Sequence, residues 1–199
     1  ELARGEVRPI DLISCNGRYS VNICSMGLDA RIGTQIDRYR RFPGLGGKGA
    51  YLASTVVNVL KGTRQPFTID FGSRRVSGEK TLICICNGSW YGGSFHPVPD
   101  ARADDGLLDV LTVDAVSLPR LATAIGAYKK GLYARFPGLI DHCRTDALTV
   151  TCPTPQVINL DGEAVTACRA AFTVLPHNLR FLAPAGVRLL SKERKGELL

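Results

Sequence analysis

Apolar and polar residues alternate over many short stretches of this chain, and most of these stretches end at a turn-forming residue. They are rich in β-branched residues and are closed by Gly, Pro, Asn or Asp, a pattern typical of strands that bury one face. A further apolar strand is expected where Asp11 stands in RPIDLISCNGRY. The other predicted strands cover residues 19–27, 66–72, 80–88, 106–116, 147–153, 156–163, 166–176 and 179–186.

Helical periodicity is confined to two stretches of the sequence. One covers Gly49–Lys61, and the other covers Ser117–Tyr133 with Ser117 as its N-cap. Because strands outnumber helices, an alternating βαβ architecture does not fit, and the pattern predicts a mainly β protein: an antiparallel β-sandwich domain with two inserted helices. In the second helix, four apolar residues share one face: Leu118, Leu121, Ile125 and Leu132.

A glycine-rich segment, PGLGGKGAYLASTVVNVL at residues 43–60, contains the GxGxxG spacing of dinucleotide-binding loops. Such a loop follows a buried strand, whereas the preceding residues, QIDRYRRFP, contain three arginines. A phosphate-binding P-loop does not fit either, because Phe42 and Gly49 stand where it needs Gly and Ser or Thr. The glycines are therefore interpreted as a turn before a helix.

The chain has 199 residues, is 45% hydrophobic and carries a formal net charge of +7. No apolar run approaches the ~18 residues of a membrane-spanning helix. The charge suits an anionic partner, namely a phosphorylated ligand, an anionic membrane surface or nucleic acid, and an ordinary solvated surface explains it equally well. Four cations are candidates for contact with a membrane surface: Arg38, Arg40, Arg41 and Lys48.

The sequence contains seven cysteines, an odd number, in a chain long enough to fold without disulfides. They are interpreted as small buried hydrophobic residues of a reducing compartment. Cys84 and Cys86 alternate within one predicted strand and should point to the same face. This pair has no second pair to complete a zinc site, and the three histidines lack metal-ligand spacing.

Two acidic turns are candidates for chemistry. The pair Asp104–Asp105 stands before a glycine, where the chain turns into a strand. Such a turn also offers the carboxylate and carbonyl oxygens that Mg²⁺ prefers. Asp161 and Glu163 flank a glycine in VINLDGEAV, which predicts a hairpin turn of type I′.

Three motifs occur in a characteristic order: IDLISCNGRYSVNICSMGLDARI, NGSWYGGSFHPVPDARADDGLLDV and INLDGE. Together they resemble the C-terminal domain of diacylglycerol-kinase-like lipid kinases, a family that includes sphingosine, ceramide and bacterial lipid kinases. The resemblance covers Pro9–Pro184 and implies the second domain of the NAD kinase/diacylglycerol kinase-like fold. The family's nucleotide signature, Gly-Gly-Asp-Gly-Thr, does not occur in the chain. Residues 1–199 are therefore expected to be a single-domain fragment, the lipid-side half of a two-domain kinase, with a frayed tail at 185–199.

The resemblance also implies roles for particular residues. Asp11 would act on the lipid hydroxyl, as a base or an orienting group, during transfer of the γ-phosphate of ATP. Asp105 would bind a structural Mg²⁺ through its side chain, and Arg102 and Leu107 would add backbone carbonyls.

The remaining implied roles concern the two substrates. Asp161 and Glu163 would face the nucleotide across the cleft between the domains, and Asp29 would lie near the lipid. The implied enzyme is an ATP-dependent lipid kinase that is cytoplasmic, peripherally associated with membranes and without a nucleic-acid partner. Two alternatives remain open: a non-catalytic domain that binds a lipid or an anion, and the related NAD kinase branch.

Overall fold

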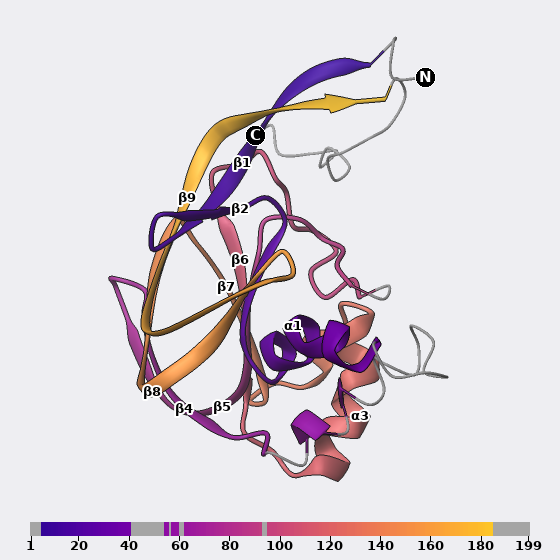
Figure 1. Ribbon diagram of the computed structural model, residues 1–199, viewed down its shortest axis with the longest axis vertical. Helices are drawn as coiled ribbons and strands as arrows, with labels where there is room; N and C mark the ends of the chain where they lie inside the picture. Colours follow the sequence, from indigo (N-terminus) through magenta and orange to yellow (C-terminus); the bar gives the residue numbers. More distant parts are fainter. Residues whose placement is uncertain (1–4, 41–53, 56, 60–61, 93–94, 185–199) are drawn as a thin grey trace, which may run out of the picture.

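The strands form an antiparallel sheet, as the alternation of the sequence predicted (Figure 1). The structure is a computed structural model that describes residues 5–40, 54–55, 57–59, 62–92 and 95–184. Within these residues the sheet has nine strands. They are β1 (Glu6–Cys15), β2 (Arg18–Ser20), β3 (Ile23–Gly27), β4 (Gln65–Asp70), β5 (Arg75–Cys86), β6 (Leu108–Asp114), β7 (Ile140–Thr145), β8 (Ala147–Leu160) and β9 (Glu163–Ala183).

The strand order is β2-β1-β9-β8-β3-β5-β6-β7, and β4 also pairs with β5 and β8. Residues 149–151 of β8 pair with β4, and residues 158–160 pair with β3. The short strands β3 and β4 therefore lie one after the other between the two long strands β5 and β8. One face of β1, β3, β4, β5, β6, β8 and β9 packs into a single apolar cluster, which requires the sheet to fold over itself as a sandwich.

Strand β5 is buried on both faces over residues 80–86. Ile83 and Ile85 belong to the cluster inside the sheet. Cys84 and Cys86 point the other way, and their Sγ atoms lie 3.4 Å apart. They belong to a second apolar cluster between the sheet and the helices, which also contains Ile23, Leu82, Val98, Ala101, Leu111, Val113, Ala124, Tyr128, Leu139 and Ile140. The prediction that these two cysteines share a buried face is confirmed, whereas Cys168 is exposed rather than buried.

The helices cover one side of the sheet, as Figure 1 shows for α1 (Leu28–Arg40) and α3 (Leu118–Lys129). Helix α1 was not predicted, so the expectation of only two helices is wrong. It begins directly after Gly27, whose φ of +84° and approach to the backbone of β5 favour a residue without a Cβ. Of the predicted helix at 49–61, residues 54–55 and 57–59 are described and are helical.

Helix α3 begins after Ser117, as predicted, but the Ser117 side chain makes no capping hydrogen bond. The helix buries Ala124 and Tyr128 against the second cluster. Of the four apolar residues predicted to share one face, Leu118 and Ile125 are 49% and 40% exposed, and Leu132 lies beyond the end of the helix. A short 3₁₀ helix, η2 (Tyr133–Arg135), follows.

Several strands differ from the prediction. The stretch predicted as one strand at 19–27 is broken at residues 21–22, which form a turn between β2 and β3. Strands β8 and β9 each join two predicted stretches into one long strand, and β7 was not predicted. The tail at 185–199 lies outside the described residues.

Candidate functional site

Asp11 stands in β1 at the point where its register with β9 shifts, between Ile10 and Leu12. Its side chain is fully buried. One carboxylate oxygen accepts the backbone N–H of Gly106 at 2.8 Å, and the other accepts that of His177 at 2.7 Å. The carboxylate therefore holds the 101–107 loop and β9 against β1.

Asn87, at the end of β5, links Asp11 to the turn between β2 and β3. Its side-chain amide donates to the carbonyl of Asp11 at 2.9 Å and to that of Val21 at 2.7 Å. Asn87 is fully buried. Because both acceptors are backbone atoms, this one amide fixes the distance between β1 and the β2–β3 turn.

Asp161 binds the same turn from the opposite side. Its carboxylate accepts three successive backbone N–H groups, from Val21 at 2.5 Å, Asn22 at 3.2 Å and Ile23 at 2.8 Å. The φ angles of Asp161 and Gly162 are +50° and +107°, so the predicted hairpin turn with two left-handed residues is confirmed.

Glu163 begins β9 on the other side of that hairpin turn and is exposed. No hydrogen bond or ion pair joins its carboxylate to any residue that the structure describes. The two acids predicted to face the nucleotide therefore differ. The carboxylate of Asp161 binds backbone N–H groups of the β2–β3 turn, whereas Glu163 projects into solvent.

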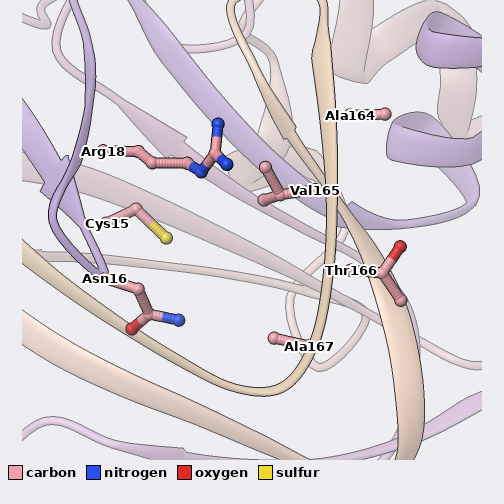
Figure 2. Close-up of a pocket in the computed structure, with 7 residues that line it drawn as sticks. All are labelled: Cys15, Asn16, Arg18, Ala164, Val165, Thr166 and Ala167. Atoms are coloured by element: carbon pink, nitrogen blue, oxygen red, sulfur yellow. The ribbon is translucent and has the colours of Figure 1, made fainter.

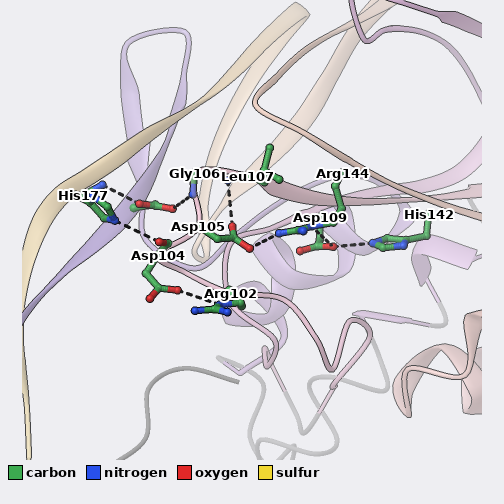
Figure 3. A network of polar contacts seen from close by, with 10 residues as sticks. Arg102, Asp104, Asp105, Gly106, Leu107, Asp109, His142, Arg144 and His177 are labelled. Atoms are coloured by element: carbon green, nitrogen blue, oxygen red, sulfur yellow. Dashed lines mark hydrogen bonds and ion pairs between the residues drawn. The ribbon is translucent and has the colours of Figure 1, made fainter. Parts of the chain in front are cut away.

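Asp105 lies in the 101–107 loop that Asp11 anchors (Figure 3). One of its carboxylate oxygens accepts the backbone N–H of Leu107 at 3.2 Å, and the other pairs with the guanidinium of Arg144. The Arg102 side chain pairs with Asp104 at 3.3 Å, so it leaves the carboxylate of Asp105 to Arg144.

A polar chain that the sequence did not predict continues from Arg144 along β6 and β7 (Figure 3). The guanidinium of Arg144 lies 3.6 Å from Asp109, and Nε2 of His142 lies 2.7 Å from the same Asp109 oxygen. Nδ1 of His142 lies 3.3 Å from the hydroxyl of Tyr133. Asp109 faces these partners because β6 and β7 pair in register, Asp109 with Arg144.

The donor set of the 101–107 loop is compatible with the Mg²⁺ predicted there. Asp105 is partly exposed, with 19% of its side chain accessible, and a carboxylate has about four lone-pair sites, of which two are used here. Mg²⁺ is held by one or two carboxylates supplemented by other oxygens. The described residues contain no cluster of three or more His, Cys, Asp or Glu side chains able to hold a metal, so a site here depends on backbone carbonyls, as predicted for Arg102 and Leu107.

Asp29 lies in the first turn of α1, in a second polar group. The hydroxyl of Tyr91 is 3.5 Å from its carboxylate and 3.1 Å from the hydroxyl of Tyr128. Burial raises the pKa of Asp29, and burial also raises the pKa values of both tyrosines. This group adjoins the Asp161 region, because the side chain of Asn22 donates to the carbonyl of Trp90 at 2.8 Å, one residue before Tyr91.

A shallow cavity of about 370 Å³ lies beside the strand that follows Glu163 (Figure 2). It is lined by residues of β1, β2 and β9, and Arg18 supplies its one charged side chain. Asn16 at its edge binds the backbone of Arg169 and Ala171, so its amide is already used. None of the predicted site acids lines this cavity.

The fold is that of a β-sandwich domain, with one antiparallel sheet folded over a single apolar cluster. Residues 22–183 match the family described as the YegS C-terminal NAD kinase beta sandwich-like domain, and the chain belongs to this family.

The relatives of this chain are longer proteins. The chain is 31% identical over 191 residues to a Shewanella frigidimarina protein named as a YegS-like lipid kinase, and it covers 59% of that protein's length. It is 23% identical to a Staphylococcus aureus protein named as a lipid kinase, again covering 59% of it. In both matches 92% of this chain is aligned.

A crystal structure named as a Bacillus anthracis diacylglycerol kinase shares the fold, with a TM-score of 0.69 over 90% of this chain and 57% of that one. The sequence identity is 22%. This likeness confirms the predicted architecture. None of the helices that the structure describes is long and apolar enough to cross a bilayer.

Proposed function

We propose that this chain is the lipid-side half of an ATP-dependent kinase that phosphorylates a lipid hydroxyl. The main support is the path from Asp11 through Asn87 and Val21 to Asp161. This path joins residues of all three family motifs: Asp11 and Val21 lie in the first, Asn87 begins the second, and Asp161 lies in the third. The lipid-kinase names of the relatives support the same class of reaction.

Within this proposal, Asp11 orients the site and Glu163 acts on the reactants. A general base must lie within hydrogen-bond reach of the proton that it removes. Both oxygens of the buried Asp11 accept backbone N–H groups, whereas the carboxylate of Glu163 is open to solvent. Asp161 supports Glu163 by fixing the hairpin turn from which it projects.

Mg²⁺ would be held by the Asp105 carboxylate with the carbonyls of Arg102 and Leu107. A bound cation supplies positive charge near the reacting groups, and phosphoryl transfer depends mainly on positioning and charge stabilisation. Asp11 keeps the loop in place through Gly106, so it sets the position of Asp105 relative to the rest of the site.

The lipid would lie on the Asp29 side, where the hydroxyls of Tyr91 and Tyr128 border the apolar second cluster. An acid among hydroxyl groups can bind the polar end of a lipid alcohol, and the apolar surroundings suit its chains. The proposed reaction takes place at the cytoplasmic surface of a membrane, where ATP is available.

The proposal is tested by phosphate transfer from radiolabelled ATP to diacylglycerol in mixed micelles with Mg²⁺. We expect no transfer by the chain alone, because positioning of the nucleotide supplies much of the rate. We expect transfer when the chain is fused to the part of the Shewanella frigidimarina relative that it does not match. In the fusion, Glu163→Gln should lower kcat by about 100-fold or more without weakening ATP binding.

The control for this assay is Asp146→Asn, a change of an exposed acid outside the site, which should leave kcat unchanged. Transfer by the chain alone would contradict the split site. A fusion that binds lipid but never transfers phosphate would favour the non-catalytic lipid-binding function instead.

A further inference from the structure

Helix α3 has an apolar stripe on its outer side. Leu118 and Ile125 are 49% and 40% exposed, and Ala122 between them is exposed as well. The three residues are spaced by four and three positions, which places them in one row on a helix. The buried side of the helix is formed by Ala124 and Tyr128, about a quarter to a third of a turn away from the stripe, so packing within the described residues does not explain the stripe.

The charge around this stripe has one sign. Helix α3 contains no acidic residue, and two exposed cations, Lys129 and Lys130, lie beside the C-terminal end of the stripe. An apolar row bordered by cations is the pattern of a helix that lies in the surface of an anionic membrane.

We propose that the outer side of α3, defined by Leu118, Ala122 and Ile125 with Lys129 and Lys130 at its C-terminal end, docks on an anionic phospholipid bilayer. The apolar row enters the boundary between headgroups and acyl chains, and the cations contact the phosphates. This inference rests on the proposed function, because a lipid acceptor has to be reached at a membrane.

The position of α3 relates the bilayer to the proposed lipid side. Tyr128, on the inner side of the same helix, contacts Tyr91, which contacts Asp29. A helix with its side chains is about 10 Å across. Docking through α3 therefore places the bilayer about one helix diameter from the polar group around Asp29, a short distance for a lipid headgroup to cross.

A second copy of this chain fits the same surface less well. In a symmetric dimer the same patch faces itself, so the cations around the two stripes would be brought together without an acid on either helix. An anionic bilayer neutralises these cations, and this charge complementarity favours it as the occupant.

The experiment is co-sedimentation of the 199-residue chain with phosphatidylcholine vesicles prepared with and without phosphatidylglycerol. We expect binding only when phosphatidylglycerol is present, and we expect it to weaken as salt is raised. Leu118→Gln/Ile125→Gln and Lys129→Gln/Lys130→Gln should each lower the affinity about tenfold. The matched control is Val7→Gln/Leu182→Gln, which changes two other exposed apolar residues and should bind as the unaltered chain does.

Circular dichroism of every variant keeps a folding defect separate from a docking defect. Folded α3 variants that bind vesicles as tightly as the control would overturn the proposal, as would a dimer of the unaltered chain that only the α3 variants dissociate. Vesicle binding requires neither ATP nor transfer, so an inactive fusion would leave this result unaffected. An active fusion whose α3 variants still bind vesicles would overturn the docking surface alone.

Discussion

Asp11 and Asp29 are two acids in opposite surroundings. Asp11 accepts two backbone N–H groups from separate segments of the chain. Asp29 receives hydrogen bonds from the side chains of Ser25 and Tyr91, and burial raises its pKa. Backbone donors make Asp11 a structural anchor, because they cannot turn away from it. Side-chain hydroxyls can rotate toward a ligand, which suits Asp29 to binding.

The first test of this difference is Asp11→Asn, which should weaken the anchor. The amide that replaces one oxygen cannot accept a hydrogen bond, so the N–H of Gly106 or His177 loses its buried partner. Breaking a buried charge-assisted pair costs about 3 kcal/mol. We expect a loss of this size in the free energy of unfolding, measured by urea denaturation with Asp146→Asn as the exposed control.

Hydrogen exchange adds a local measurement to this prediction. In Asp11→Asn, the amide of Gly106 should exchange far faster than in the unaltered chain, because the 101–107 loop has lost its anchor. Unchanged stability together with unchanged exchange at Gly106 would show that Asp11 does not hold the loop.

The hairpin turn offers the second test, because substitutions of its two acids should reduce stability by different amounts. Asp161→Asn weakens the contact with three backbone N–H groups and should cost about 1.5 kcal/mol of stability. Glu163→Gln changes an exposed carboxylate without a described partner and should cost less than about 0.5 kcal/mol. Urea denaturation of both variants decides the matter, and a larger loss for Glu163→Gln would reverse the two assignments.

The sequence predicted the sheet well, because burial on one face leaves a period of two residues that can be read locally. The hairpin at Asp161 was predicted for a similar reason, since Asp-Gly favours two left-handed residues. Helix α1 was missed although Leu28, Ile32 and Ile36 are spaced by four positions, a signal of an amphipathic helix. That spacing could have identified the helix before the structure was known.

Long-range pairing explains the features that could not be predicted. Arg144 reaches Asp105 and Asp109 only because β6 and β7 pair in one particular register, and no local pattern encodes that register. The exposure of the apolar face of α3 could not be predicted, because periodicity identifies a stripe but does not tell whether protein covers it. Asp11 was recognised as important through the family motif, whereas its burial depends on the 101–107 loop that folds over it.

The third prediction concerns pH and Asp29. Its pKa is raised from the ordinary value of 3.8, so above this pH the folded chain retains a proton that the unfolded chain releases. The free energy of unfolding then falls as the pH rises, until the folded carboxyl also ionises. Asp29→Asn removes this loss, so its stability relative to the unaltered chain should increase as the pH rises above the ordinary pKa of 3.8, measured by urea denaturation.

Asp70→Asn is the control with the opposite sign. The hydrogen bond from Arg75 lowers the pKa of Asp70, so this carboxylate stabilises the fold above its unfolded pKa, and the stabilisation is lost as the pH falls. Asp70→Asn should therefore be less stable than the unaltered chain at neutral pH and should match it in acid. Parallel pH profiles of stability for the two variants would contradict the raised pKa of Asp29 in the folded chain.

The smallest expected effect tests the ion pair between Arg144 and Asp105. Arg144 is 43% exposed, and pairs of this kind contribute at most about 1 kcal/mol, so Arg144→Gln should change stability little.

The same variant should change Mg²⁺ binding. A guanidinium on the Asp105 carboxylate opposes a second cation, so removal of the guanidinium should tighten Mg²⁺ binding about fivefold in calorimetric titration. Asp105→Asn should abolish that binding, whereas Arg135→Gln, a change in the 3₁₀ helix η2 outside the loop, should leave it unaltered. Weaker Mg²⁺ binding by Arg144→Gln would mean that Arg144 positions the carboxylate for the metal instead of competing with it.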